Sequence, residues 1–248
     1  MFLAERFIVC AMNRTILITT AIFFTQLASA QEKISADTIQ HHPVSLQIKW
    51  YQANAFKIAA VPAALIGYSL TIMNDRGLYS SYDARDYARE NYPRFNTEVD
   101  NYLTALPAVM MYSLNIAGVE SRNNWVNQTL ILAMSQATNA FLTWSTKELT
   151  GVERPDGSDN LSFPSSHTSV SFVMAEVLHQ EFKDKSIWIS VAGYSVASAV
   201  GAMRMLNNRH WLSDVVAGAG FGILSVKLTY LLYPKIHKKA CSAEAKGL

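Results

Sequence analysis

Three short polar segments, each set between apolar runs, carry the residues best suited to chemistry. They span residues 147–155, 163–167 and 204–214, and together they supply cations, hydroxyls, two histidines and a carboxylate. Cleavage of a phosphate ester by a protein nucleophile needs fixed positive charge around the phosphate oxygens, a nucleophile, and an acid for the leaving oxygen. The segments contain a group for each task, so the sequence indicates phosphoryl chemistry.

The third segment pairs a histidine with a carboxylate at helical spacing. His210 and Asp214 are four residues apart, so on a helix they lie on one face. A carboxylate there can accept the proton of one imidazole nitrogen and leave the other nitrogen free as a nucleophile. Such a pair alone is more often structural than catalytic, and its combination with the other two segments makes it a candidate.

The second segment is typical of the start of a helix. Ser165 fits the N-cap position, and the backbone N–H groups that follow it form a ready anion site. His167, in the first turn, is therefore placed to donate a proton to a leaving group. A serine in this position can equally be a cap and nothing more.

Three cations lie at the ends of the apolar runs: Lys147, Arg154 and Arg204. The planar fork of arginine suits phosphate oxygens, although each of these charges could also merely flank a helix. The remaining histidines lack such company and are expected at the surface; they are His41, His42, His179 and His237. No acid or cysteine at ligand spacing supports a metal at the adjacent pair, so no metal site is predicted.

The scaffold that must position these segments is predicted to be all-α. Apolar runs predict six helices, over residues 56–74, 103–118, 125–146, 166–182, 187–203 and 211–233. No stretch alternates convincingly as a strand. We therefore expect one six-helix bundle over residues 56–233, with Gly218, Gly220 and Gly222 allowing close helix packing. The last helix is expected to stop at Pro234, before a basic tail over 234–248 in which Lys235 to Lys239 are expected to be disordered.

Residues 75–102 are rich in tyrosine and arginine and do not follow the apolar pattern. We interpret them as a surface excursion with short helical turns. They could form part of the mouth of the site, but solvated surface is the favoured interpretation.

The first thirty residues follow the signal-peptide pattern. Arg14 precedes an apolar run, and Ala28-Ser29-Ala30 ends it. We predict a signal peptide over residues 1–30, with an uncleaved membrane anchor as the alternative, followed by a polar N-terminal extension over 31–55. This predicts export to a periplasm or cell envelope.

Composition leaves the relation to a membrane open. Half of the residues are hydrophobic and 16% are charged, and the apolar runs are long enough to span a bilayer. Several runs contain many polar residues, however. In addition, an exported N-terminus followed by six membrane spans would put the three polar segments on the cytoplasmic side. A soluble or membrane-associated domain is therefore favoured over a fully integral one. The net charge of +2 gives no argument for a nucleic-acid partner.

The three segments resemble the signature of the type 2 phosphatidic acid phosphatase (PAP2) superfamily, which includes class A acid phosphatases and vanadium haloperoxidases. The family pattern is K-x6-R-P, then P-S-G-H, then S-R-x5-H-x3-D. The first part is matched fully, from Lys147 to Pro155. In the second part Ser166 replaces glycine, and in the third Met203 replaces the leading serine.

The resemblance implies a role for each matched residue. His210 would be the nucleophile that forms a phosphohistidine, Asp214 its orienting partner and His167 the general acid. The phosphate would be held by Lys147, Arg154, Ser165, the backbone N–H of Ser166, and Arg204. The family's phosphatases need no metal or other cofactor. Neither departure removes a charged group, so activity is expected to survive.

The predicted function is that of a cell-envelope phosphatase acting on phosphate monoesters or pyrophosphates through a phosphohistidine. A lipid phosphate is slightly favoured over a soluble ester as substrate. A vanadium-dependent haloperoxidase is the alternative enzyme, disfavoured because those enzymes resemble much longer chains. A non-catalytic phosphate- or lipid-binding protein is disfavoured because every charged signature position is filled. The sequence does not indicate an oligomeric state.

Overall fold

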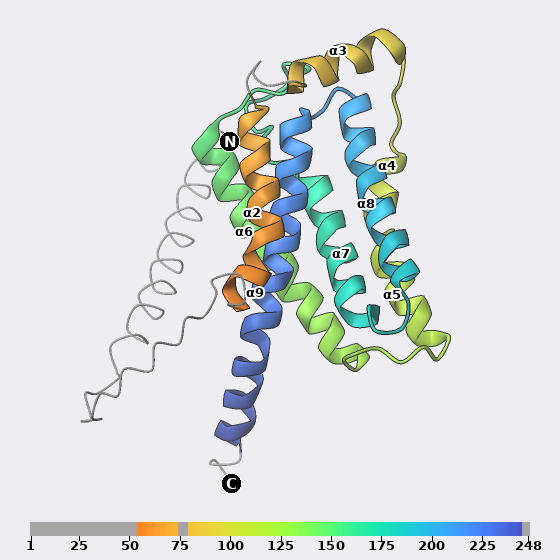
Figure 1. Cartoon of the computed structure of the whole chain (residues 1–248), viewed down its shortest axis with the longest axis vertical. Coiled ribbons are helices and arrows are strands. Elements are labelled where there is room, and N and C mark those ends of the chain that lie inside the picture. Colours follow the sequence, from red (N-terminus) through yellow and green to blue (C-terminus); the bar gives the residue numbers. More distant parts are fainter. Residues whose placement is uncertain (1–53, 74–78, 245–248) are drawn as a thin grey trace, which may run out of the picture. The chain divides into compact units, whose positions relative to one another are not determined.

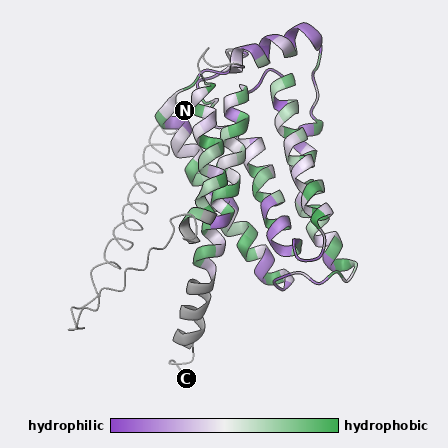
Figure 2. Ribbon diagram, viewed as in Figure 1, coloured by the Kyte–Doolittle hydropathy of each residue, from purple (hydrophilic) through white to green (hydrophobic). Residues whose placement is uncertain are grey.

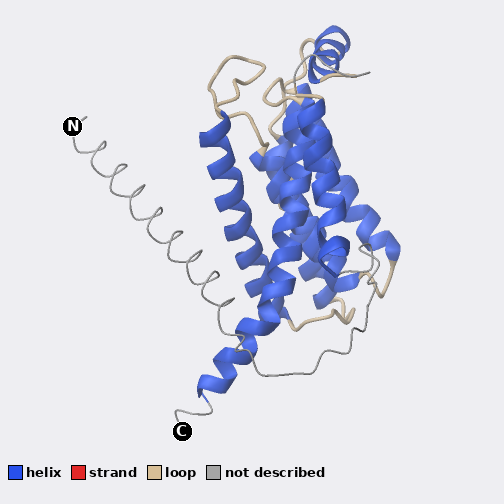
Figure 3. Ribbon diagram, turned by 60° about the vertical axis from the view of Figure 1, so that its left-hand side comes forward, coloured by secondary structure: helices blue, strands red, loops and turns tan. Residues whose placement is uncertain are grey.

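The computed structural model describes residues 54–73 and 79–244, and all regular structure in these ranges is helical (Figure 3). The elements, in chain order, are α2 (Asn54–Thr71), α3 (Ser81–Asn91), α4 (Val99–Leu103), α5 (Leu106–Ile116), α6 (Trp125–Thr150), α7 (Ser166–Phe182), α8 (Ile187–Leu206) and α9 (Leu212–Glu244). The prediction of an all-α fold is confirmed for this part of the chain. The predicted signal peptide and nearly all of the predicted N-terminal extension lie outside the described residues.

Helix α7 is the central element of the bundle, and it packs against α5, α6, α8 and α9. Its buried side chains Val173, Val177 and Phe182 join Met111 of α5 and Val226 of α9 in one apolar core. Removing a buried phenylalanine side chain from such a core costs about 3–5 kcal/mol. The core therefore fixes α7, whose first turn contains Ser166 and His167.

Local signals set the helix ends near the polar segments. The side chain of Asn124 caps α6 by accepting from the backbone of Asn127. At its other end α6 stops at Gly151, whose φ of 58° lies in the left-handed region that glycine adopts without strain. Ser165 is the N-cap of α7. The loop between Gly151 and Ser165 is thereby held at both ends by defined helix termini.

The glycines of α9 let this helix approach its neighbours closely, as predicted. A Cβ atom on Gly218 would lie 2.7 Å from the backbone oxygen of Ser165, and one on Gly222 would lie 2.5 Å from that of Ser169. Real Cβ atoms are not found at such distances, so only glycine permits this packing of α9 against the start of α7. The close approach brings the first turn of α9 beside the N-terminus of α7.

Helix boundaries agree closely with the sequence pattern, with one clear error. The prediction for α7 is confirmed at both ends, whereas α6 runs four residues further than predicted, to Thr150. The prediction that the last helix stops at Pro234 is wrong, because α9 continues to Glu244 through residues predicted to be a disordered tail. A proline removes one N–H and crowds the preceding turn, but a helix can continue past it with a local distortion. Helix α2 likewise continues through Pro62.

The tyrosine-rich region contains the short helices α3 and α4. A capping box between Ser80 and Asp83 starts α3. This helix is strongly hydrophilic (Figure 2), and it lies across the end of the bundle where α8 ends and α9 begins (Figure 1). The prediction of short helical turns is confirmed for the described part of this region.

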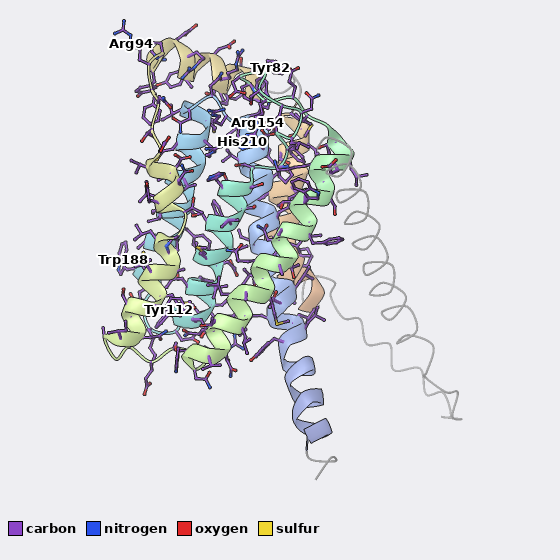
Figure 4. The ribbon with its side chains drawn as sticks, turned by 180° about the vertical axis from the view of Figure 1, so that it is seen from behind. Tyr82, Arg94, Tyr112, Arg154, Trp188 and His210 are labelled. Carbon is purple, nitrogen blue, oxygen red and sulfur yellow. The ribbon has the colours of Figure 1, made fainter. Side chains whose placement is uncertain are left out.

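Among the residues that the structure describes, two helical stretches are long and apolar enough to cross a membrane, Ile187–Leu206 and Leu212–Tyr233. On α8, only 28% of the most apolar window is buried within the protein. Large apolar side chains at its start are exposed, with Ile187 at 62% and Trp188 at 74%. Trp188 lies well away from His210 along the bundle (Figure 4).

Candidate active site

The three polar segments meet at one end of the bundle (Figure 4). Here α6 and α8 end while α7 and α9 begin, because consecutive helices in this part of the chain run in alternating directions. Lys147 lies in the last turn of α6 and Arg204 in the last turn of α8. Asp214 lies in the first turn of α9. The fold thus gathers residues that are up to 67 positions apart in the sequence, from Lys147 to Asp214.

His210 and Asp214 form a buried pair, with 4% and 0% of their surfaces exposed. His210 Nδ1 lies 3.2 Å from Asp214 Oδ2. The same carboxylate oxygen accepts from the Ser162 hydroxyl at 2.5 Å and from the Trp211 backbone N–H at 2.9 Å. Three contacts on one oxygen fix the carboxylate, so the carboxylate in turn fixes the imidazole.

The other nitrogen of His210 faces a permanent cation. Arg154 Nη1 lies 3.1 Å from His210 Nε2. Because a guanidinium can only donate, Nε2 must be the unprotonated nitrogen and Nδ1–H must donate to Asp214. This is the tautomer that leaves a lone pair on Nε2 available for attack on an electrophile.

The charge state of His210 agrees with this tautomer. Burial lowers the pKa of His210 to about 4, although the hydrogen bond and charge of Asp214 oppose the shift. The cations Arg154 and Lys147 lower the pKa further. The imidazole is therefore neutral, and its free nitrogen is nucleophilic, at any pH well above 4.

Lys147 is 5% exposed and ties the end of α6 to the loop that follows. Its ammonium donates to the backbone oxygens of Leu161, at 2.5 Å, and Ser162, at 3.1 Å. Burial lowers the pKa of Lys147 to about 8, with Arg154 adding to the shift and Asp214 opposing it. Lys147 therefore carries its charge at neutral pH and loses much of it in mildly alkaline solution.

The two arginines are each held by a carboxylate. Arg154 Nε lies 2.8 Å from Asp159 Oδ1, and Arg204 Nη1 lies 2.9 Å from Asp100 Oδ2. Within the described ranges Arg204 Nε has no hydrogen-bond partner although it is buried. Both guanidinium groups keep donors beyond those used by the carboxylates, and these can bind an oxyanion.

The start of α7 supplies neutral donors. The backbone N–H of Ser165 donates to the backbone oxygen of Asp214 at 3.0 Å, which joins α7 to α9. Its hydroxyl accepts from Thr168 at 2.9 Å, so its own proton remains free to donate. Ser166 and His167 occupy the first turn of α7, where backbone N–H groups lack intrahelical acceptors. A helix N-terminus of this kind favours a phosphate.

His167 is half-buried, and its Nε2 lies 2.9 Å from Asn101 Oδ1 of α4. Burial lowers the pKa of His167 below its ordinary value. Arg204, Arg154 and Lys147 lower this pKa further, while Asp100 raises it. His167 thus sits among the same charged groups as the other site residues.

All the site residues predicted from the sequence lie in this one region of the structure, which also contains residues that the sequence did not reveal. Ser162, Asp100 and Asn101 each contact a predicted site residue directly. Ser162 falls one residue before the second polar segment, and the two α4 residues lie in the region favoured as solvated surface.

The tyrosine-rich region also forms a wall of the site. The ring centroids of Tyr82 and Trp211 lie 4.8 Å apart, and the guanidinium carbon of Arg85 lies 5.7 Å from the centroid of the Trp211 ring. A cavity of about 200 Å³ opens beside Arg154, lined by Met73, Tyr82, Val152, Glu153, Arg154, Trp211 and Ser213. The favoured interpretation of this region as solvated surface is therefore wrong for the residues that contact the site.

The surface predictions for the other histidines have different outcomes. His179 was expected at the surface, but it is half-buried and its Nδ1 lies 2.8 Å from the Ser190 hydroxyl. The predictions for His41 and His42 fall outside the described residues, and the described part of His237 is its backbone in α9.

Comparison with known proteins finds sequence similarity to one family. Residues 125–238 match the sequence model of the PAP2 superfamily. A lipid A 1-phosphatase from Porphyromonas gingivalis is 39% identical over 137 residues, which are 55% of this chain and 31% of that protein. The chain therefore spans about a third of the length of the curated relative it matches.

Two solved structures are similar to this chain at low sequence identity. A transmembrane PAP2-type phosphatidylglycerolphosphate phosphatase from Bacillus subtilis is 18% identical, with a TM-score of 0.50 over 71% of this chain and 97% of that one. LpxE from Aquifex aeolicus is 19% identical, with a TM-score of 0.44 over 58% of this chain and 93% of that one.

Proposed function

From the premise that residues 125–238 belong to the PAP2 superfamily, we propose that this chain is a membrane-associated phosphatase of lipid phosphates that works through a phosphohistidine. The observation that carries the proposal is the pair of contacts on His210. Its Nδ1–H is directed to Asp214 and its Nε2 lone pair faces Arg154. A buried neutral imidazole whose unprotonated nitrogen faces a cation is positioned to attack the phosphorus atom of a phosphate that the cation binds.

In the first step Nε2 of His210 attacks the phosphorus atom, and the P–N bond forms as the ester P–O bond breaks. His167 gives its proton to the leaving oxygen. Lys147, Arg154 and Arg204 hold the phosphate oxygens, assisted by donors at the start of α7. Asp214 stabilises the positive charge that develops on the imidazole of His210.

In the second step water attacks the phosphohistidine. His167, now neutral, takes a proton from this water, and the P–N bond breaks to release inorganic phosphate. His210 returns to its neutral form, with Nδ1–H still directed to Asp214. Each residue ends the cycle in the state in which it began.

Three observations support a lipid phosphate as substrate and a membrane as the location. The relative that is 39% identical is named a lipid A 1-phosphatase. Helix α8 and the first part of α9 are long and apolar enough to cross a membrane. The start of α8 exposes Ile187 and Trp188, and an exposed tryptophan suits the boundary between lipid and water. The substrates are therefore proposed to be phosphate monoesters or pyrophosphates of lipids in a cell envelope.

The test is hydrolysis by the full chain in detergent of three substrates: p-nitrophenyl phosphate, phosphatidate in mixed micelles, and lipid A. We expect the lipids to be hydrolysed in preference to p-nitrophenyl phosphate, and His210→Ala to abolish turnover of all three. A chain that binds phosphate but has no turnover, or a His210→Ala variant as active as the parent, would contradict the proposal and favour a binding protein.

The role of His167 has a separate test in the choice of leaving group. Nitrophenolate is a stable anion and leaves without a proton, whereas the alkoxide of phosphatidate needs one. We expect His167→Ala to lower kcat/KM for phosphatidate by about 10²–10⁴-fold and kcat/KM for p-nitrophenyl phosphate much less, because kcat/KM does not include the later hydrolysis of the phosphohistidine that both substrates share. Equal losses for both substrates would exclude His167 as the general acid.

A further inference from the structure

Helix α4 contributes two consecutive residues that contact the candidate active site, although no part of the signature lies there. Asp100 Oδ2 pairs with Arg204 Nη1 of α8 at 2.9 Å. Asn101 Oδ1 lies 2.9 Å from Nε2 of His167 at the start of α7. This five-residue helix therefore contacts one proposed phosphate-binding residue and the proposed general acid at the same time.

The Asp100–Arg204 pair is buried, with side-chain exposures of 1% and 12%. Over the described ranges the second carboxylate oxygen of Asp100 and the Nε of Arg204 have no hydrogen-bond partners. Each charge is thus balanced mainly by the other. A buried ion pair of this kind is costly to break from one side, because the remaining charge is left uncompensated.

The backbone around α4 is itself anchored to the end of α8. The side-chain amide of Asn207 donates to the backbone oxygen of Thr97 at 2.9 Å, and its side-chain oxygen accepts from the Thr97 N–H at 3.0 Å. Arg89 donates to the backbone oxygen of Leu206 at 2.8 Å. Asp100 is therefore presented to Arg204 from a segment that is fixed at several points.

Resting on the proposed phosphatase function, we propose that Asp100 is a positioning residue. It fixes the Arg204 guanidinium for the phosphate and, together with Asn101, sets the orientation and protonation of the His167 imidazole. The serine that the superfamily pattern places before this arginine is Met203 here, and Arg204 is held by a carboxylate from another helix.

The electrostatic consequence can be measured. The charged groups that act on His167 are Arg204, Arg154 and Lys147, which lower its pKa, and Asp100, which raises it. Replacing Asp100 by asparagine removes its raising contribution to this pKa and leaves Arg204 unpaired. The pKa of His167 should then fall further. Because a general acid must be protonated, kcat/KM should begin to decline at a lower pH on the alkaline side of the profile.

The experiment compares the parent, Asp100→Asn and Asp100→Glu as full chains in detergent, with phosphatidate as substrate. We expect Asp100→Asn to lower kcat/KM about 10- to 100-fold and to shift the alkaline limb to lower pH. Asp100→Glu keeps the charge, so its limb should stay near that of the parent. Asp184→Asn is the matched control, since Asp184 is exposed just beyond the end of α7, and it should change neither quantity.

A double-mutant cycle then tests whether Asp100 acts through Arg204. If it does, Asp100→Asn should have little further effect in an Arg204→Gln background. Additive losses would overturn the proposal. So would a fall in kcat with an unmoved pH limb and a lowered Tm, because this pattern indicates a purely structural role.

A measurement without turnover separates this proposal from the proposed function. The His167 imidazole resonance, assigned by its loss in His167→Gln, can be titrated by NMR in the parent and in Asp100→Asn. A lower midpoint in the variant supports the positioning role even if no substrate is hydrolysed. An unchanged midpoint overturns it even if the parent is an active phosphatase.

Discussion

Asp214→Asn is the substitution that most directly tests the mechanism proposed for His210. Asparagine keeps the shape of the side chain and an oxygen that can still accept from Ser162 and from the Trp211 N–H. The variant loses the negative charge beside the imidazole. The change therefore separates the electrostatic contribution of Asp214 from its contribution to packing.

The magnitude follows from one distance. His210 Nδ1 lies 3.2 Å from Asp214 Oδ2, and two unit charges at that separation attract by about 5 kcal/mol at an effective dielectric constant of about 20. Because the phosphorylated imidazole spreads its charge over the ring, we expect the carboxylate to stabilise it by about 3–5 kcal/mol. This range corresponds to a loss of about 10²–10⁴-fold in kcat.

The assay combines steady-state turnover of phosphatidate with trapping of the phosphoenzyme. An alkaline quench preserves phosphohistidine, so the amount of phosphorylated protein measures the first step directly. We expect Asp214→Asn to form phosphohistidine more slowly while its KM changes little. A Tm close to that of the parent ensures that both proteins are folded.

One result would refute the reasoning. If folded Asp214→Asn retained kcat within about tenfold of the parent, the carboxylate would not be stabilising a charged imidazole. His210 would then act in some other way, for example by binding the phosphate as a neutral hydrogen-bonding group.

Four other outcomes are expected from the same geometry. Ser162→Ala should lower kcat about 10-fold with little change in KM, because one hydrogen bond to a buried carboxylate is lost; unchanged kcat would contradict this. The kcat/KM profile should be bell-shaped. His210 must be neutral, which holds above its pKa of about 4, and His167 must be protonated, which holds below a pKa that burial and the neighbouring cations lower from its ordinary value. Constant kcat/KM from about pH 5 to 8 would contradict this expectation. Inhibition by orthovanadate should weaken above about pH 8, where Lys147 loses its charge, and this pH dependence should be absent in Lys147→Gln. Gly218→Ala should cost about 1–3 kcal/mol in the free energy of unfolding, because its Cβ would lie 2.7 Å from a backbone oxygen of α7; an unchanged Tm would show that α9 is not held this closely.

The parts of this structure that sequence predicted well are those with local signals. The ends of α7 follow from the serine cap before it and the charged turn after Phe182. The glycines of α9 predict close packing, since few other roles require three glycines in five positions of an apolar helix. The signature residues are likewise readable because they lie at fixed spacings within short segments.

The parts that sequence missed depend on contacts across long separations. Asp100 meets Arg204 over 104 residues, and Asn101 meets His167 over 66. Ser162 meets Asp214 over 52 residues. Nothing beside these residues in the chain distinguishes them from ordinary polar surface. The error at Pro234 has a different origin, because a proline weakens a helix without always ending it.

The pairing of both arginines with carboxylates has a consequence for catalysis. Asp159 and Asp100 reduce the attraction of the site for any phosphate, which includes the product. Tight binding that is equal in the ground state and the transition state does not raise kcat. Hydrogen-bond donors that are already fixed in place do raise kcat, because they stabilise the charge that develops in the transition state without reorganising at the moment of reaction. If Asp100 positions Arg204 as proposed, this pairing favours turnover over affinity, and loosening the pair should slow the chemical step even where phosphate still binds.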